Sequence, residues 1–165
     1  MPTHSRASLI RGHGDYHLGQ VLYTGNDFVL IDFEGEPARP LSERRIKRVA
    51  LRDVASMLRS YDYAAEVGRL DVADRGLVER ESEAFEGLAE WAAFWQRWVG
   101  AAFLRGYRDA AKPPFATTPE ETAQLLPAYL LDKALYEVSY ELGSRPELVD
   151  VPLRGIRTIL EWETS

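Results

Sequence analysis

Apolar positions along the chain change their spacing once. Up to about residue 34, short apolar runs rich in β-branched and aromatic residues occupy positions 7–10, 20–23 and 28–31. The last two runs flank the segment 24–27, Thr-Gly-Asn-Asp, whose glycine and asparagine tolerate the positive φ of a tight turn. This part of the sequence therefore predicts a β-hairpin.

From Pro40 onward the apolar spacing becomes helical. A first helix is indicated by apolar residues that recur at three and four positions, namely Leu51, Val54, Ala55, Leu58, Tyr61 and Ala65. The segment from roughly Leu77 to Ala111 lacks proline and predicts one long helix or two abutting ones. Its aromatic residues also follow helical spacing, which is typical of a buried stripe, although tryptophan rings also stack on sugars; they are Trp91, Phe94, Trp95 and Trp98.

A third helical region follows. Thr118 is a capping hydroxyl, Pro119 occupies the first helical position and two acids follow, so a helix should begin here. Pro127 should kink or restart it before it ends near Leu142. A short terminal helix is expected from about 152 to 162. The predicted fold is mainly α, of the α+β class, in a single domain over 1–165.

Composition narrows the function. The formal charge is −6 and the sequence pI about 5.2, which argues against a phosphate-backbone footprint and against anionic membrane surfaces. The chain contains no cysteine, so disulfide frameworks and thiolate metal sites are excluded. No apolar stretch approaches a membrane span. We expect a cytoplasmic protein with neither nucleic acid nor membrane as a partner.

Three polar residues near the hairpin have the layout of a phosphotransfer site. Asp15 follows an apolar run in a loop, Gln20 lies five residues on, and Asp32 comes at the end of the predicted hairpin. Magnesium-dependent transfer from a nucleotide needs a carboxylate that positions and deprotonates the acceptor hydroxyl, and oxygen ligands for the metal. Asp15 suits the first role, and Gln20 with Asp32 suits the second.

Neighbouring residues have supporting roles. Glu34 shares a strand face with Asp32 and is a candidate direct or indirect metal ligand. His13 and His17 are interpreted as scaffold, because hard magnesium prefers oxygen ligands. Asp53 lies near a helix N-terminus, where the dipole alone explains an acid.

The same residues support a resemblance. Segment 13–20, HGDYHLGQ, resembles the HGDxHxxN loop of aminoglycoside and choline phosphotransferases, and segment 31–34, IDFE, resembles their metal-binding segment. Gln20 stands where most of that superfamily has asparagine. Together with segments 35–65, 131–138 and 152–156, the chain resembles maltokinase, the ATP-dependent enzyme that makes maltose 1-phosphate and is often fused to trehalose synthase.

The resemblance implies a structure and a mechanism. The chain would be the second half of the helical C-terminal lobe of a protein-kinase-like, aminoglycoside-phosphotransferase fold, with the nucleotide-binding lobe outside these 165 residues. ATP would be the co-substrate, Mg²⁺ the metal and maltose or a related sugar the acceptor, with Asp53 bracing the catalytic loop. Sugar-binding candidates are Asp132, Lys133, Tyr136, Glu137 and Arg154.

Alternatives stay open at this point. The acceptor could be an aminoglycoside, choline or another small alcohol. The chain could also be a non-catalytic remnant that binds sugar or a partner chain, such as a nucleotide-binding lobe or trehalose synthase. Ordinary pairing on a helix surface explains the charges at 132–137 equally well. A half-lobe should expose apolar surface, so we also expect a homodimer or a poorly soluble monomer.

Overall fold

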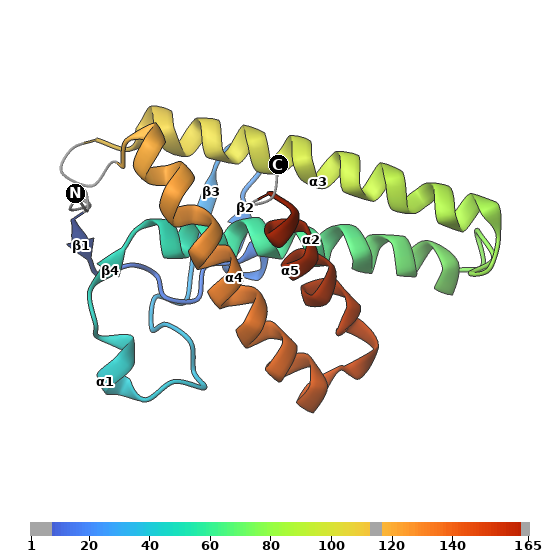
Figure 1. Ribbon diagram of the computed structural model, residues 1–165, viewed down its shortest axis with the longest axis horizontal. Coiled ribbons are helices and arrows are strands. Elements are labelled where there is room, and N and C mark those ends of the chain that lie inside the picture. The colour runs from blue at the N-terminus through green and yellow to red at the C-terminus, as the bar shows by residue number, and fades with distance from the viewer. Residues whose placement is uncertain (1–7, 113–116, 163–165) are drawn as a thin grey trace.

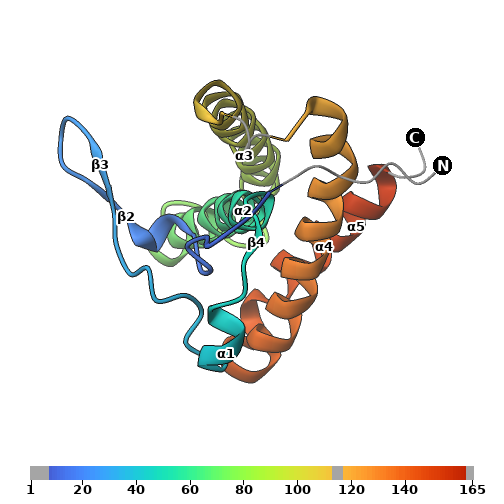
Figure 2. The same cartoon turned by 90° about the vertical axis from the view of Figure 1, so that its left-hand side faces the viewer.

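The computed structural model describes residues 8–112 and 117–162, and most of these residues are helical. Helices α2 to α5 form the body of the molecule, and the hairpin β2–β3 projects from it (Figures 1 and 2). The mainly helical fold expected from the sequence is confirmed. In chain order the elements are β1 (Leu9–Ile10), a 3₁₀ turn (Leu18–Gln20), β2 (Val21–Tyr23), β3 (Phe28–Leu30), α1 (Leu41–Arg44), β4 (Arg48–Val49), α2 (Leu51–Asp74), α3 (Glu83–Ala110), α4 (Pro119–Ser144), a second 3₁₀ turn (Pro146–Leu148) and α5 (Asp150–Trp162).

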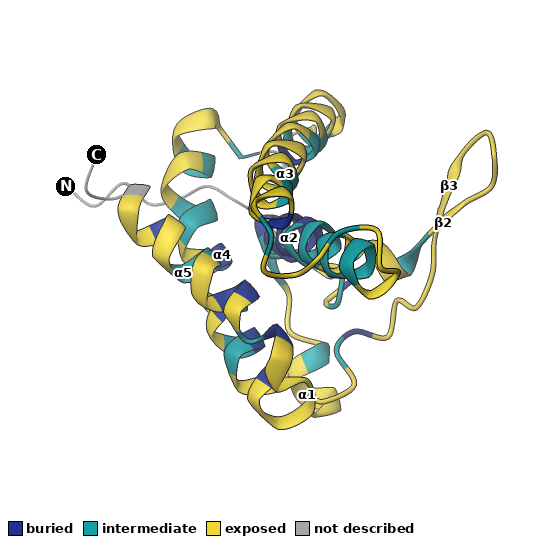
Figure 3. Ribbon diagram, turned by 90° about the vertical axis from the view of Figure 1, so that its right-hand side faces the viewer, coloured by how far each residue is buried: buried dark blue, intermediate teal, exposed yellow. Residues whose placement is uncertain are grey.

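Helix α2 is the centre of the core. It packs against α3, α4 and α5, and its apolar face is the most deeply buried part of the fold (Figure 3). The predicted periodicity is confirmed for five of its six residues, which cluster with Leu130 of α4 and Ile159 of α5; Ala65 is only half-buried, and Met57 was not predicted. The buried core residues of α2 are Leu51, Val54, Ala55, Met57, Leu58 and Tyr61.

Two small antiparallel pairings place the segment 11–20. Strand β1 pairs with β4, with Leu9 opposite Val49, which brings the loop after β1 beside the start of α2. Strands β2 and β3 form the predicted hairpin, with Leu22 opposite Val29. In its turn Gly25 has φ 95°, as expected for the glycine.

Helix α3 differs from the prediction in its start and in its burial. It begins at Glu83, because the Ser82 hydroxyl accepts a hydrogen bond from the Phe85 backbone N–H and caps the helix. The predicted buried aromatic stripe is wrong: Trp91 is 70% exposed and Trp98 65% exposed. Helical spacing places these rings on one face, but no described element covers that face (Figure 3).

Helix α4 begins as predicted. The Thr118 hydroxyl and the Glu121 carboxylate form a reciprocal capping box, with Pro119 at the first helical position. The restart predicted as one alternative at Pro127 is wrong, since α4 continues through it to Ser144. Within residues 8–112 and 117–162, no helix has both the length and the apolar character that a membrane crossing requires.

Candidate active site

The loop between β1 and the first 3₁₀ turn is fixed to α2 by Asp53. The Asp53 carboxylate accepts hydrogen bonds from the backbone N–H of His13 at 2.6 Å and of Gly14 at 3.0 Å. A Cβ atom at Gly12 would overlap this carboxylate, so the close approach requires glycine. The His13 Nε2 donates to the Ile31 carbonyl at 2.8 Å, which ties the loop to the segment after β3. Asp53 and His13 therefore lie where their predicted supporting roles place them.

Asp15 lies two residues beyond this anchor, with its side chain 16% exposed. His17 Nε2 is 3.7 Å from Asp15 Oδ2, and Lys133 Nζ of α4 is 4.0 Å from Asp15 Oδ1. The His17 imidazole holds the pKa of Asp15 below its usual value, partly against the opposing effect of burial, and the Lys133 ammonium adds to the lowering. Asp15 is consequently an ionised carboxylate at neutral pH.

The two predicted metal ligands meet in space. His17 caps the 3₁₀ turn, since its Nδ1 accepts from the Gly19 N–H, and the turn directs Gln20 toward Asp32. The Gln20 Nε2 donates to Asp32 Oδ2 at 3.1 Å. Asp32 has φ 62°, a left-handed conformation that non-glycine residues adopt rarely and that is enriched at functional sites.

Glu34 does not join this pair. Its carboxylate is largely exposed and lies 3.8 Å from the Arg44 guanidinium. Among the described residues, no three His, Cys, Asp or Glu side chains converge on one point as a metal site would require. The pair of Gln20 and Asp32 fits Mg²⁺ nevertheless, because this ion is usually held by one or two protein oxygens together with waters and substrate phosphates. A half-turn of the Gln20 amide exchanges its nitrogen for its oxygen.

A narrow cleft adjoins Asp15 between its loop and α4. Its cavity of about 10 Å³ is the size of one water molecule. Burial and the Glu36 carboxylate raise the pKa of Tyr136 to about 12, so this phenol stays a neutral donor at neutral pH. Cationic groups stack on the same ring, Lys133 at 5.1 Å and Arg39 at 5.5 Å from its centroid. The lining residues are Gly14, Glu36, Arg39, Arg52, Ser56, Tyr129, Asp132, Lys133 and Tyr136.

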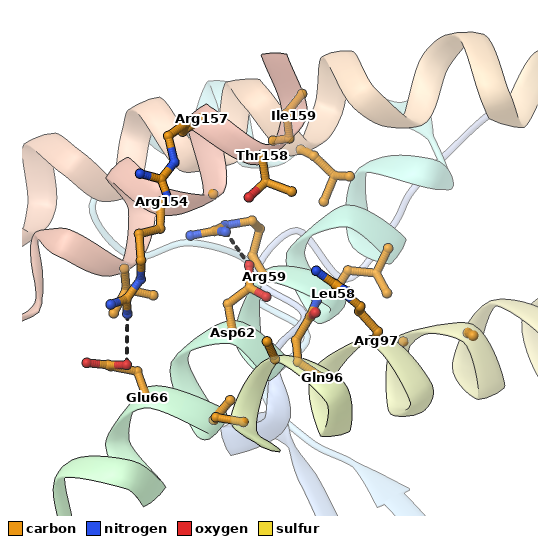
Figure 4. A pocket seen from close by; sticks show the side chains of 18 of the residues that line it. Leu58, Arg59, Asp62, Glu66, Gln96, Arg97, Arg154, Arg157, Thr158 and Ile159 are labelled. Carbon is orange, nitrogen blue, oxygen red and sulfur yellow. Dashed lines mark hydrogen bonds and ion pairs between the residues drawn. The ribbon is translucent and has the colours of Figure 1, made fainter. Parts of the chain in front are cut away.

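Two of the predicted sugar ligands lie elsewhere. Glu137 is buried on another side of α4, where its Oε2 accepts from Arg59 Nε at 2.9 Å. Burial raises its pKa, and Arg59 opposes that shift. Arg154 of α5 lies 2.8 Å from Glu66 in a separate cavity between α2, α3 and α5 (Figure 4). The structure therefore brings Asp132, Lys133 and Tyr136 to Asp15, but neither Glu137 nor Arg154.

The cleft also contains residues that sequence reasoning missed. Glu36, Arg39 and Arg52 line it although none was assigned a role from the sequence. All three belong to the segments that carry the family resemblance, which is the signal that could have found them. Their contact with α4 joins positions about ninety residues apart, which spacing along the chain does not predict.

The arrangement as a whole suits transfer of a group to a hydroxyl. The ionised Asp15 carboxylate faces a cleft that holds the Lys133 ammonium, the neutral Tyr136 phenol and the carboxylates of Glu36 and Asp132. Beyond His17, the Asp32 carboxylate and the Gln20 amide offer oxygen ligands. Such a set can orient an acceptor hydroxyl and hold a cation near it. These are the features of an active site for a small-molecule kinase.

Comparisons with known proteins agree with that class. The chain is 29% identical over 160 residues to a glucosamine kinase of Mycolicibacterium smegmatis, a match that covers 95% of this chain and 36% of the relative. A glucosamine kinase of Streptacidiphilus jiangxiensis is 37% identical over 59 residues, 36% of this chain and 14% of that protein. No model of a protein family matches the chain.

Solved structures extend the similarity to the fold. A glucosamine kinase in complex with glucosamine, ADP and inorganic phosphate superposes with a TM-score of 0.63 at 25% identity, over 92% of this chain and 35% of that one. Another crystal form of a glucosamine kinase gives a TM-score of 0.65 over 94% of this chain. The chain is therefore related to sugar kinases, and it spans about a third of the length of the relatives it matches. The more specific resemblance to maltokinase is not confirmed, since these relatives are glucosamine kinases.

Proposed function

We propose that the chain is the acceptor-binding and metal-binding portion of an ATP-dependent sugar kinase. The observation that carries the proposal is the placement of Asp15, whose loop is anchored by Asp53 and whose carboxylate faces Lys133 of α4. A relative named a glucosamine kinase, matched over 95% of the chain, and a related structure that holds ADP support the reaction class.

In this mechanism Asp15 orients the acceptor hydroxyl for in-line attack on the γ-phosphate. A carboxylate with a lowered pKa is a weak base, which suits a loose transition state in which the acceptor proton leaves late. His17, and to a lesser degree Lys133, lower the pKa of Asp15, and Lys133 can also donate to an acceptor oxygen. Asp53 and His13 contribute by holding the backbone of the loop rigid.

Gln20 and Asp32 are the residues that would hold Mg²⁺. The ion would neutralise charge on the phosphates of ATP. Asp32, as the single carboxylate of the pair, supplies the charge, and Gln20 supplies a neutral oxygen. Glu34 stays a weaker candidate, because reaching this pair requires it to leave Arg44.

The acceptor is proposed to be an amino sugar. The relatives are glucosamine kinases, and one related structure contains glucosamine. Glu36 and Asp132 place two carboxylates in the cleft that can accept hydrogen bonds from a protonated amine, alongside the cations Arg39, Arg52 and Lys133. Maltose, which the resemblance to maltokinase predicts, has no such amine and would use Tyr136 and Lys133 instead. Association with trehalose synthase stays a prediction.

Binding of the acceptor tests this proposal. Because the cleft admits only about one water, we expect it to open on binding and the affinity to be weak, no tighter than about millimolar or roughly −4 kcal/mol. Backbone NMR of the labelled chain should show saturable shifts at residues 13–17 and 132–136 on titration with glucosamine. Maltose, choline and an aminoglycoside are the competing acceptors.

Two variants make the titration specific. Lys133→Met should weaken glucosamine binding at least threefold, whereas Lys112→Met, a lysine outside the cleft, should leave it unchanged. Saturable shifts with maltose and none with glucosamine would exclude an amino sugar as the acceptor and favour maltose, as the resemblance to maltokinase predicts. Shifts with none of the four compounds would count against an acceptor site in this chain.

A further inference from the structure

A large cavity lies between α2, α3 and α5, separate from the cleft at Asp15. Its volume is about 670 Å³, against about 10 Å³ for the cleft. Helix α2 packs against both α3 and α5, whereas α3 and α5 stand apart, and the cavity occupies the space between them (Figures 3 and 4). The described helices thus form the floor and two walls of a groove.

Small side chains on α3 leave room in the groove for another helix. The side of α3 that faces it has small residues at helical spacing, which include Ala89, Ala93, Gly100 and Ala101. The floor is apolar at Leu58 of α2 and Leu130 of α4, and it also carries the ion-paired side chains of Arg59, Asp62 and Glu66. Helices pack at 8–10 Å between their axes when the contacting side chains are small enough to interdigitate. A helix laid in the groove would complete the layer between α3 and α5.

The lining of the groove is basic on balance, with four arginines against the carboxylates of Asp62 and Glu66, although the chain as a whole carries a charge of −6. Arg97, Arg154 and Arg157 line the groove, and Arg154 extends from α5 toward Glu66 of α2 (Figure 4). Among the described residues Arg97 makes no ion pair, and Arg157 makes a long and exposed one with Glu161 at 3.8 Å. Arg154 is paired with Glu66, yet about half of its side chain is exposed. Positive charge is therefore available to an occupant.

We propose that this groove is a docking site for an amphipathic helix with a narrow apolar face flanked by carboxylates. The arginines of the groove favour an occupant that carries carboxylates. The small residues of α3 favour a helix over a bulky loop, because they allow close packing. About two-thirds of the Mycolicibacterium smegmatis relative, and of the matched glucosamine kinase structure with ADP, lies outside the match, so polypeptide that could supply such a helix exists in related proteins. A second copy of this chain is disfavoured as the occupant, because a two-fold contact through this face would bring the groove arginines of one copy against those of the other, and like charges repel.

A synthetic peptide tests the proposal on the chain as it is. The chain contains no cysteine, so Ala93→Cys gives a single labelling site inside the groove for an environment-sensitive dye. The probe is a helical peptide of about four turns with leucine and alanine on one face and glutamates beside it. We expect a saturable blue shift of the dye, and at least tenfold weaker binding of a matched peptide with lysines in place of the glutamates.

Two further variants separate docking in the groove from general adhesion. Ala101→Trp places a large side chain in the groove and should abolish the response, whereas Ala102→Trp, on the same helix outside the groove, should preserve it. Equal binding of the acidic and basic peptides, or no binding of either, would overturn the proposal. A blue shift of the Ala93→Cys dye that grows with protein concentration without peptide, and that Ala101→Trp removes, would assign the groove to a second copy and overturn the proposal as well.

Discussion

Replacing Asp53 should loosen the catalytic loop and cost measurable stability. The Asp53 carboxylate satisfies two backbone N–H groups, of His13 at 2.6 Å and of Gly14 at 3.0 Å. A hydrogen bond to a charged group contributes about 1.5–3 kcal/mol, and the bond to Gly14 is solvent-exposed and belongs at the low end. Asp53→Ala should therefore lower the free energy of unfolding by about 3–4.5 kcal/mol. Asp53→Asn, which retains one acceptor oxygen, should lose less.

Urea unfolding and hydrogen exchange measure the two consequences. The midpoint and slope of unfolding give the change in stability, and exchange of the His13 and Gly14 amides reports the loop directly. Asp71→Ala is the matched control, because Asp71 lies on the same helix in an exposed pair with Arg75 and should change stability by under about 1 kcal/mol. If Asp53→Ala were no more destabilising than Asp71→Ala, with unchanged exchange at residues 13 and 14, the bracing role would be refuted.

Three further predictions follow from the same geometry. Asp32→Asn should weaken Mg²⁺ or Mn²⁺ binding in calorimetry without changing the fold, since it removes charge at constant size, and equal binding in both proteins would remove Asp32 from the metal site. Arg59→Met should cost about 3–5 kcal/mol at neutral pH, because it leaves the buried Glu137 and its neighbour Asp62 without their cation. Burial raises the pKa of both carboxyls, so the folded state binds protons more tightly than the unfolded state. The loss of stability in Arg59→Met should therefore shrink as the pH falls and the two carboxyls become neutral. A loss that stays constant between about pH 4 and pH 8 would disprove this explanation. The exposed aromatic face of α3 should make the chain a homodimer or a poorly soluble monomer, and light scattering that shows a well-behaved monomer at micromolar concentration would count against this.

Features that depend on neighbours within one or two turns could be predicted from the sequence. The capping box at Thr118, the turn at Gly25 and the apolar face of α2 are of this kind, because the partners lie three or four positions apart. The pair of Gln20 and Asp32 could also be predicted, since a hairpin of known length returns the chain to its starting point.

Features that depend on distant partners could not. The stripe that contains Trp91 and Trp98 has the periodicity of a core face, but burial requires a covering element that no pattern within α3 reveals. Glu137 shares its helix with Lys133, yet Arg59, 78 positions earlier, draws it to another side of α4. Glu36 reaches the cleft only because the loop before α1 folds back against α4.

Phosphoryl transfer in a hybrid enzyme tests the central claim most directly. The matched third of the Mycolicibacterium smegmatis glucosamine kinase would be replaced by this chain, and cooperative unfolding would confirm that the hybrid folds. The account predicts ATP-dependent phosphorylation of glucosamine that falls by a factor of about 10²–10⁴ in kcat on Asp15→Asn, with little change in KM. A folded, ATP-binding hybrid whose activity is absent, or is the same with and without the Asp15→Asn change, would contradict it.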